Sequence, residues 1–397
     1  MKVEKEGMQT IQILGNTTYG GGTYLILKWC RYLLERGCQV DVLSTDAMTI
    51  QELGQIPEVH VVNDIMIPRD IAPVVDLRAF LQLLSYLHKK QYDVVHTYTS
   101  APGVLGRITA RLAGTPVILH HQTGWAVTLF SSPLERILYT PPLYLAALAS
   151  TKTICVSHAT AQQARQFHVA PQHKLVTICN GIDPSPFISS TRDGPGNALR
   201  QELGIPADCL VIGSTGRLAP SKEYDVLIQA MVHLKSLIVE TPFILLLAGD
   251  GPDRQILEGL VCSLVLGEQV RFLGFRRDIP ALLAGLDVFI SPSRCEGMSI
   301  SLLEAMAAAR PIVTTSILPN AELIEHEVTG LLVPLRDPEP IAQAITRFVQ
   351  EPELAQRCAS AARQRVLERY TIDRMFEETW DMYIDLLKKE RPRSLVA

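Results

Sequence analysis

The feature that most limits the fold of this chain is a repeated alternation of short β-branched runs with longer amphipathic runs. The first series predicts strands at residues 10–15, 39–45, 59–64, 92–98, 115–121 and 151–157. Runs with helical spacing lie between them at 22–37, 74–91 and 103–114. Strands that alternate with helices indicate βαβ units, and therefore a doubly wound parallel α/β sheet.

The same alternation starts again near residue 209. It predicts strands at 209–218, 243–251, 270–275, 286–293, 311–316 and 330–335. The stretch between the two series, residues 180–198, is rich in Pro, Gly, Ser and Asp and has no hydrophobic period, which is typical of a linker. The expected domains are a Rossmann-like domain over 1–185, a flexible linker over 186–205, a second Rossmann-like domain over 206–372 and a closing helix over 373–397.

Composition fits this division and excludes some classes of function. A chain of 397 residues that is 47% hydrophobic can bury two cores. Two such domains are expected to face each other across a cleft, so that a ligand held there touches both. The net charge of −4 gives no reason to expect nucleic-acid binding. The eight cysteines are scattered without metal-ligand spacing, which favours reduced thiols in a cytoplasmic protein.

No long apolar segment predicts a membrane span, because the longest uninterrupted apolar run is residues 143–149. Peripheral contact with a membrane stays open. The segment 77–90 has an apolar face followed by a basic end at His88, Lys89 and Lys90. That face could pack on its own sheet or meet anionic lipid. It consists of Leu77, Phe80, Leu81, Leu84 and Leu87.

The first candidate for binding is the glycine run in "NTTYGGGTYLIL", residues 16–27, which follows the first predicted strand and opens a helix. Glycine allows close approach of a ligand, and a helix N-terminus offers unpaired N–H groups to an anion. The three adjacent glycines match neither the dinucleotide fingerprint nor a P-loop. A tight turn without a ligand is the alternative.

The second candidate is the loop in "GSTGRLAPSKEYDVLIQA", residues 213–230, which contains Arg217 and Lys222. Two cations between a strand and a helix suit a diphosphate, although ordinary solvated surface explains them as well. The glycine turn "AGDGPDR", residues 248–254, is interpreted as structural.

The third candidate is a pair of acids, Glu296 and Glu304, around the start of an apolar helix that follows the strand 286–293. Acids near a helix N-terminus can simply interact favourably with the helix dipole. At the carboxyl edge of a parallel sheet, where open α/β folds bind ligands, they could instead accept hydrogen bonds from hydroxyl groups.

Several of these segments occur in an order that resembles a known family. "GRLAPSK", "LAGDGPDR", "VRFLGF", "EGMSISLLE" and "ELIEHEVTGLLVP" follow one another as in the nucleotide-sugar half of the family 4 retaining glycosyltransferases. The segment "GGGTYLILKWCRYLLERGCQVDVLS" resembles the opening helix of that family, and 369–387 resembles its closing helices. The resemblance is weakest over 120–150. It implies the two-domain GT-B fold, with the last helix returning to the N-terminal domain.

The resemblance also implies roles for the candidates. Glu296 would face the hexose hydroxyls of the donor, Glu304 would bind the ribose hydroxyls, and Arg217 with Lys222 would neutralise the diphosphate. The donor-binding set is completed by Gly22, Phe275, Arg276, Met298 and Ser299. Gly22 lies in the N-terminal loop that closes on the donor, the nucleobase would lie against Phe275 and Arg276, and the helix N-terminus near Met298 would stabilise the leaving group.

Four positions depart from the family pattern. Ser299 and Pro319 stand where glycines are common, so the identity of the sugar is open. Glu223 replaces a glycine directly after Lys222 and adds an acid beside the phosphate cation. The usual histidine of the N-terminal domain falls on Thr123. This leaves two displaced candidates, His120 and His121, of which His121 is assigned to the catalytic set.

The resemblance implies transfer of a hexosyl group from a UDP-sugar, or alternatively from GDP-mannose, to an acceptor hydroxyl of a glycan or glycolipid, with retention. No metal or other cofactor is expected, because the sequence contains no Asp-x-Asp triplet. An epimerase or hydrolase of the same fold is the nearest alternative. A non-enzymatic hinge-type binding protein is a second alternative, but it would not need the charged set. The expected location is cytoplasmic, with possible contact at the inner membrane surface.

Overall fold

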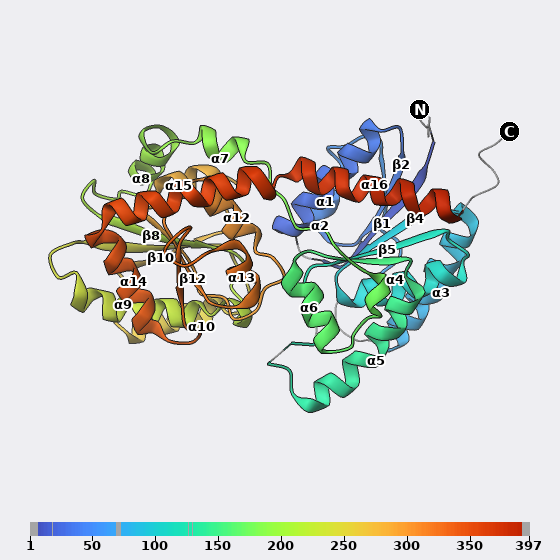
Figure 1. Cartoon of the computed structure of the whole chain (residues 1–397), viewed down its shortest axis with the longest axis horizontal. Helices are drawn as coiled ribbons and strands as arrows, with labels where there is room; N and C mark the ends of the chain where they lie inside the picture. Colours follow the sequence, from blue (N-terminus) through green and yellow to red (C-terminus); the bar gives the residue numbers. More distant parts are fainter. Residues whose placement is uncertain (1–6, 18, 69–72, 126, 129, 391–397) are drawn as a thin grey trace. The chain divides into compact units, whose positions relative to one another are not determined.

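The computed structural model describes residues 7–17, 19–68, 73–125, 127–128 and 130–390. The chain divides into two compact units, of which the first runs to Asn180 and takes up the chain again from Asp373, while the second is Gly181–Ile372. Each unit is a parallel sheet covered by helices (Figure 1), as the alternation in the sequence predicted.

The first unit contains a seven-stranded sheet in the order β3-β2-β1-β4-β5-β6-β7. All of its neighbouring strands pair in parallel. The strands are β1 Gln9–Gly15, β2 Gln39–Ser44, β3 Val59–Val62, β4 Val94–Tyr98, β5 Val117–Gln122, β6 Lys152–Cys155 and β7 Leu175–Thr177. The central strands β1 and β4 are almost entirely buried, which fits a sheet covered on both faces.

In the described part of the first unit, six helices and a 3₁₀ turn connect these strands. They are α1 Gly21–Glu35, α2 Ala47–Leu53, α3 Pro73–Lys90, α4 Ser100–Leu112, α5 Pro133–Ala149, α6 His158–Gln166 and η1 Gln172–Lys174. Figure 1 shows α1 on one side of the sheet and α3, α4 and α5 on the other. No helix within the described ranges combines the length and apolar character that crossing a bilayer requires.

The last helix, α16 Ile372–Glu390, belongs to the first unit, which confirms the predicted return of the C-terminal helix. The ring of Phe376 lies 5.2 Å from that of Trp29 on α1, and the ring of Tyr383 lies 5.5 Å from the same tryptophan. The Tyr383 hydroxyl is 2.7 Å from Nδ1 of His96 on β4. This helix therefore packs on α1 and reaches the core of the sheet.

The second unit contains a six-stranded parallel sheet in the order β10-β9-β8-β11-β12-β13. Its strands are β8 Leu210–Thr215, β9 Phe243–Ala248, β10 Val270–Gly274, β11 Val288–Ser291, β12 Ile312–Thr315 and β13 Leu331–Val333. Its helical elements are α7 Ser185–Ser189, η2 Arg192–Gly196, α8 Asn197–Glu202, η3 Pro220–Lys222, α9 Tyr224–Leu237, α10 Arg254–Ser263, α11 Ile279–Gly285, α12 Ile300–Ala307, α13 Leu318–Leu323, α14 Pro338–Gln350 and α15 Pro352–Arg369.

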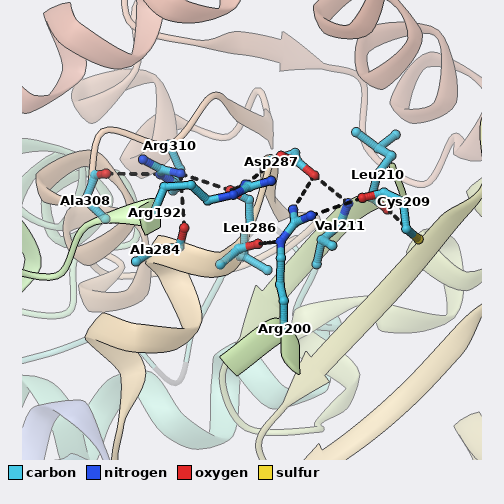
Figure 2. Close-up of polar contacts among 11 residues, drawn as sticks. Arg192, Arg200, Cys209, Leu210, Val211, Ala284, Leu286, Asp287, Ala308 and Arg310 are labelled. Carbon is cyan, nitrogen blue, oxygen red and sulfur yellow. Dashed lines mark hydrogen bonds and ion pairs between the residues drawn. The ribbon is translucent and has the colours of Figure 1, made fainter. Parts of the chain in front are cut away.

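The prediction of a flexible linker over 186–205 is wrong. This segment folds as α7, η2 and α8 within the second unit, whose boundary lies at Gly181. Arg192 and Arg200 donate to the two carboxylate oxygens of Asp287 at 2.7 and 2.6 Å, as Figure 2 shows. The same carboxylate accepts the Val211 N–H at 2.7 Å. The partner of both arginines lies far along the chain, so local composition could not reveal this anchor.

The sequence patterns missed several elements of the first unit, namely α2, α5, α6, η1 and β7. β7 has only three residues, which is too short for a recognisable alternation. α5 contains Pro141 and Pro142, and prolines inside a helical pattern normally indicate its end. Its start is secured by a capping box in which Ser132 accepts the Glu135 N–H and the Glu135 side chain accepts the Ser132 N–H.

Candidate functional site

The loops after β8, β9 and β11 are held together at the carboxyl edge of the second sheet. The N–H of Gly216 donates to the Ala248 carbonyl, and the N–H of Leu218 donates to the Asp250 carbonyl, both at 3.0 Å. The loop after β11 joins them through the backbone N–H of Arg294, which donates to the Ser221 carbonyl at 3.0 Å. Strands that lie side by side thus present their following loops as one connected surface.

Three glycines make this close contact possible. Gly216 and Gly249 have φ values of +148° and +143°, which side chains rarely allow. A Cβ on Gly249 would lie 1.9 Å from the Gly216 carbonyl oxygen, and one on Gly251 would lie 2.3 Å from the Leu218 oxygen. The turn 248–254 is structural, as predicted, and it supports the turn that carries Arg217.

Lys222 and Glu296 meet within this surface. Their Nζ and Oε1 atoms are 2.5 Å apart, and their side chains are only 21% and 11% exposed. Burial alone would lower the pKa of Lys222, but the nearby Glu296 carboxylate outweighs it and raises that pKa. Arg217 lies exposed in the same loop, five residues before Lys222. The structure therefore joins the predicted diphosphate loop to the first of the two acids.

Glu304 lies on α12, and burial raises the pKa of its carboxyl to about 8. At neutral pH this group is therefore largely protonated. Ser299 caps the same helix, because its hydroxyl accepts the Leu302 N–H at 3.4 Å. The neighbouring Met298 is 4% exposed, so its side chain belongs to the core. The serine that departs from the family pattern thus has a local structural use.

Glu223, the second departure, has φ +47°, a left-handed conformation that favours the glycine usual at this position. Its carboxylate is directed to arginines of other loops. Nε of Arg336 is 2.9 Å from Oε1, and Nε of Arg294 is 4.0 Å from the same oxygen. Because Arg336 follows β13 and carries no recognisable motif, the sequence did not indicate this partner.

The predicted nucleobase residues follow β10. Phe275 is 47% exposed and presents an aromatic ring at the surface. Arg276 is paired with Asp278 through Nε at 2.8 Å and with Glu202 through Nη1 at 3.1 Å. These bonds, that to Asp278 above all, raise the pKa of Arg276. Arg276 thus fixes the segment beside Phe275 to α8.

The two candidate histidines of the first unit differ sharply. His120 is fully buried, with Nδ1 2.9 Å from the Thr97 hydroxyl and Nε2 2.8 Å from Oε1 of Gln122. His121 is half-buried at the carboxyl end of β5, and its Nε2 is 3.4 Å from Oδ1 of Asn180. Burial lowers the pKa of His121 to about 4, so its imidazole is neutral at pH 7. Only His121 has access to the surface.

The glycine run opens α1 in the first unit. Gly22 is exposed, and a Cβ added to Gly20 or Gly22 would meet no atom within 4 Å. Neither glycine has the positive φ that a tight turn would demand. Gly20 is the N-cap of α1, a position where glycine is favoured, whereas no contact with the described residues accounts for Gly22.

The predicted site residues belong to two different units. The second unit brings together Lys222 and Glu296 and places Arg217, Glu304, Phe275 and Arg276 around the same sheet edge. Gly22 and His121 belong to the first unit. Two parallel α/β units, of which one carries cations, acids and an exposed aromatic ring at a sheet edge, are the features expected of the GT-B class of nucleotide-sugar glycosyltransferases.

Comparisons with known proteins agree with this class. A family model described as Glycosyltransferase Family 4 matches residues 19–186, and one described as Glycosyl transferases group 1 matches residues 197–365. The chain belongs to the family 4 glycosyltransferases, which use nucleotide-sugar donors.

Individual relatives span most of the chain. The UDP-Gal:alpha-D-GlcNAc-diphosphoundecaprenol alpha-1,3-galactosyltransferase of Escherichia coli is 29% identical over 80% of this chain and 82% of its own length. The D-inositol 3-phosphate glycosyltransferase of Saccharomonospora viridis is 27% identical over 77% and 72%. The crystal structure of Anabaena Alr3699/HepE in complex with UDP-glucose has a TM-score of 0.82, with 22% identity, over 95% of this chain and 99% of that one.

Proposed function

We propose that this chain transfers a hexosyl group from a UDP-sugar to an acceptor hydroxyl of a glycan or glycolipid, with retention at the anomeric carbon and without a metal ion. The observation that carries the proposal is the partly buried Lys222–Glu296 pair at the edge of the second sheet, in the loop region that also carries the exposed Arg217. It couples a cation for the diphosphate to an acid for the hexose. The names of the Escherichia coli relative and of the Anabaena complex, which both include a UDP-sugar, support UDP over GDP.

In this reaction the bond between the anomeric carbon and the phosphate oxygen breaks, and a bond to the acceptor oxygen forms on the same face. The acceptor proton passes to the leaving phosphate, so no dedicated protein nucleophile is needed. Arg217 and Lys222 stabilise the negative charge that grows on the diphosphate. Because Lys222 is already paired with Glu296, we infer that the donor exchanges the Glu296 carboxylate for a phosphate oxygen at Nζ.

Glu296, once released, accepts hydrogen bonds from the hexose, and Glu304 accepts them from the ribose. Carboxylates are strong acceptors for hydroxyl groups, and a charged partner makes such a bond about twice as strong as a neutral one. In the first unit, neutral His121 would contact the reacting groups. The open space beside Gly22 would leave room for the donor. The roles of these two residues rest on the family resemblance and on their exposure.

The proposal is tested by thermal unfolding with UDP, GDP and a panel of their sugars at millimolar concentration. A ligand at 100 times its Kd stabilises the native state by about 2.7 kcal/mol. We expect the largest shift with UDP-hexoses, a smaller one with UDP and little with GDP or free hexoses. Stabilisation by free sugars without UDP would indicate a binding protein instead. Donor turnover that does not require an added acceptor would indicate a hydrolase or epimerase.

A further inference from the structure

α5 directs its large apolar side chains away from the protein. Leu134 and Ile137 are 75% and 72% exposed. The inward face of the same helix consists of Leu143, Ala146 and Ala147. Its outward face comprises Leu134, Ile137, Leu138, Pro141, Tyr144, Leu145 and Leu148. These residues are spaced so that they share one face of α5. The helix therefore turns the face with its larger apolar side chains to the solvent.

The neighbouring helices extend this surface. α4 packs against both α3 and α5, so the three helices form one layer over the sheet. α4 exposes Leu112, and α3 exposes Leu77 and Leu81 from the stripe noted in the sequence. Leu87 of that stripe is buried, so the stripe is divided between the core and the surface. We call the exposed apolar residues of α3, α4 and α5 the apolar layer.

Basic residues border the apolar layer, although the chain as a whole has a net charge of −4. Residues 73–180 contain nine Lys and Arg but only three Asp and Glu. Three of the cations gather where α4 and α5 end. Nζ of Lys174 is 2.6 Å from the Leu148 carbonyl, and its pKa is lowered by burial and then by the charges of Arg111 and Lys152. At the end of α3, Lys89 and Lys90 are exposed.

We propose that the apolar layer docks on an anionic lipid bilayer, with α5 lying in the interface between headgroups and acyl chains. This inference deepens the proposed function, because it names the surface from which a lipid-linked acceptor would be reached. A helix with an apolar face and basic flanks binds such interfaces by combining buried apolar area with attraction to anionic headgroups. Exposed contiguous apolar patches on soluble proteins commonly indicate an interaction surface.

A second copy of the chain fits this surface less well than a bilayer. A twofold interface places the same patch on both subunits. It would bring the cluster of Arg111, Lys152 and Lys174 of one copy near that of the other, and like charges across an interface oppose association. An anionic bilayer instead supplies the opposite charge together with an apolar interior.

Flotation of the purified full chain with vesicles tests the proposal. The vesicles are phosphatidylcholine alone, or phosphatidylcholine with phosphatidylglycerol at about one lipid in three. The test variant changes Leu134, Ile137 and Leu145 to Gln. The matched control changes Leu237, Val239 and Ile256, exposed apolar residues of the second unit, to Gln. Gln has a helix propensity close to that of Leu, so α5 should still form.

We expect the wild type and the control to float with the anionic vesicles, more weakly at high salt and hardly at all with neutral ones. The α5 variant should lose about tenfold or more in partitioning. A second variant, Lys89→Glu with Lys90→Glu, should lose severalfold with anionic vesicles only. Equal flotation of the α5 variant and the wild type would overturn the proposal, and so would a wild type that stays in the soluble fraction.

Two further measurements distinguish membrane binding from dimerisation and from unfolding of a variant. Sedimentation velocity shows whether the wild type is a dimer. If it is a dimer that the α5 substitutions disrupt, and the wild type does not float with vesicles, this face binds a second copy of the chain instead of a bilayer. Stabilisation by UDP, measured on the same samples, shows that each variant is folded. If UDP fails to stabilise the wild type, the proposed function fails while the flotation result remains interpretable.

Discussion

The carboxyl edges of the two sheets lie at equivalent places in similar folds, yet their chemistry differs. At the edge of the second sheet, Lys222 and Glu296 form a partly buried ion pair. In the first sheet, β4 and β5 carry His96, His120 and His121, whose pKa values are all lowered, primarily by burial. One edge presents paired charges that a diphosphate can redistribute. The other presents the neutral imidazole of His121, which suits contact with uncharged hydroxyl groups, while His96 and His120 are enclosed.

This difference is tested most strongly by removing the cations of the second unit. Arg217→Ala and Lys222→Ala should each cost about 2–3 kcal/mol of transition-state stabilisation, or roughly 30- to 150-fold in kcat/KM. Lys235→Ala, at the far end of α9, is the matched control and should leave turnover unchanged. If both site variants turn over normally, the diphosphate does not lie at this loop.

The division of labour between the two acids is the next largest effect. If Glu304 holds the ribose, Glu304→Gln should weaken both UDP and the UDP-sugar by about tenfold, the value of a lost charge-assisted hydrogen bond. Glu296→Gln should weaken or slow only the sugar nucleotide. Calorimetry with UDP and with UDP-hexoses measures both affinities. An equal loss of UDP affinity in the two variants would contradict the assignment.

Glu304 also predicts a pH dependence. Burial raises the pKa of its carboxyl to about 8, and ribose hydroxyls donate best to the ionised form. UDP binding should therefore release a proton below pH 8, so the affinity should rise from pH 6 to about 8 and then level off. The Glu304→Gln variant should lose this rise, whereas a rise that persists in the variant would have another origin.

How far the sequence could predict these structures depends on the range of the interactions. Every described strand except the three-residue β7 follows from a local pattern, and so do the loop cations, so these were found. The Asp287 anchor joins residues that are about ninety positions apart, and no local pattern contains it. His120 and His121 point to opposite faces of β5. Both faces of a parallel sheet are covered, so alternation could not decide which histidine is enclosed.

α5 shows a different limit. Its apolar spacing would be the same whether the stripe faced the sheet or the solvent. Only the structure reveals that Ala146 and Ala147 face inward while Leu145 and Leu148 face outward. The pair of prolines hides the helix further, because Pro141 and Pro142 remove backbone donors and normally disfavour a helical interior.

The histidines of the first unit predict a smaller effect, on stability. They are neutral in the native state but have an ordinary pKa near 6.5 when unfolded. Their contribution to the free energy of unfolding is therefore fully present above about pH 6.5 and falls as the pH decreases. For His121 this fall levels off below the native pKa of about 4. Each histidine changes stability by at most about 1.4 kcal/mol per pH unit in this window.

Tryptophan fluorescence can follow this loss in the first unit alone, because Trp29, Trp125 and Trp380 all belong to it. Urea unfolding at several pH values should give a shallower pH slope in His121→Gln than in the wild type. The exposed His173 provides the control, since His173→Gln should keep the wild-type slope. A slope unchanged in the His121 variant would show that other groups cause the acid sensitivity.

The smallest expected effect is that of metal removal, which tests whether the cations of the second unit hold the diphosphate without a metal. A hard cation such as Mg²⁺ requires carboxylate or water oxygens, and it holds a diphosphate by bridging them. The sequence has no Asp-x-Asp triplet, and the loop proposed for the phosphates supplies Arg217 and Lys222 instead. Fixed cations and a metal neutralise the same oxygens, so the two arrangements replace each other. Turnover in excess EDTA should therefore remain within about twofold of the untreated rate. A loss of activity that added Mg²⁺ or Mn²⁺ restores would mean that the donor is held through a metal, and that the ion pair of the second unit serves the fold instead of the diphosphate.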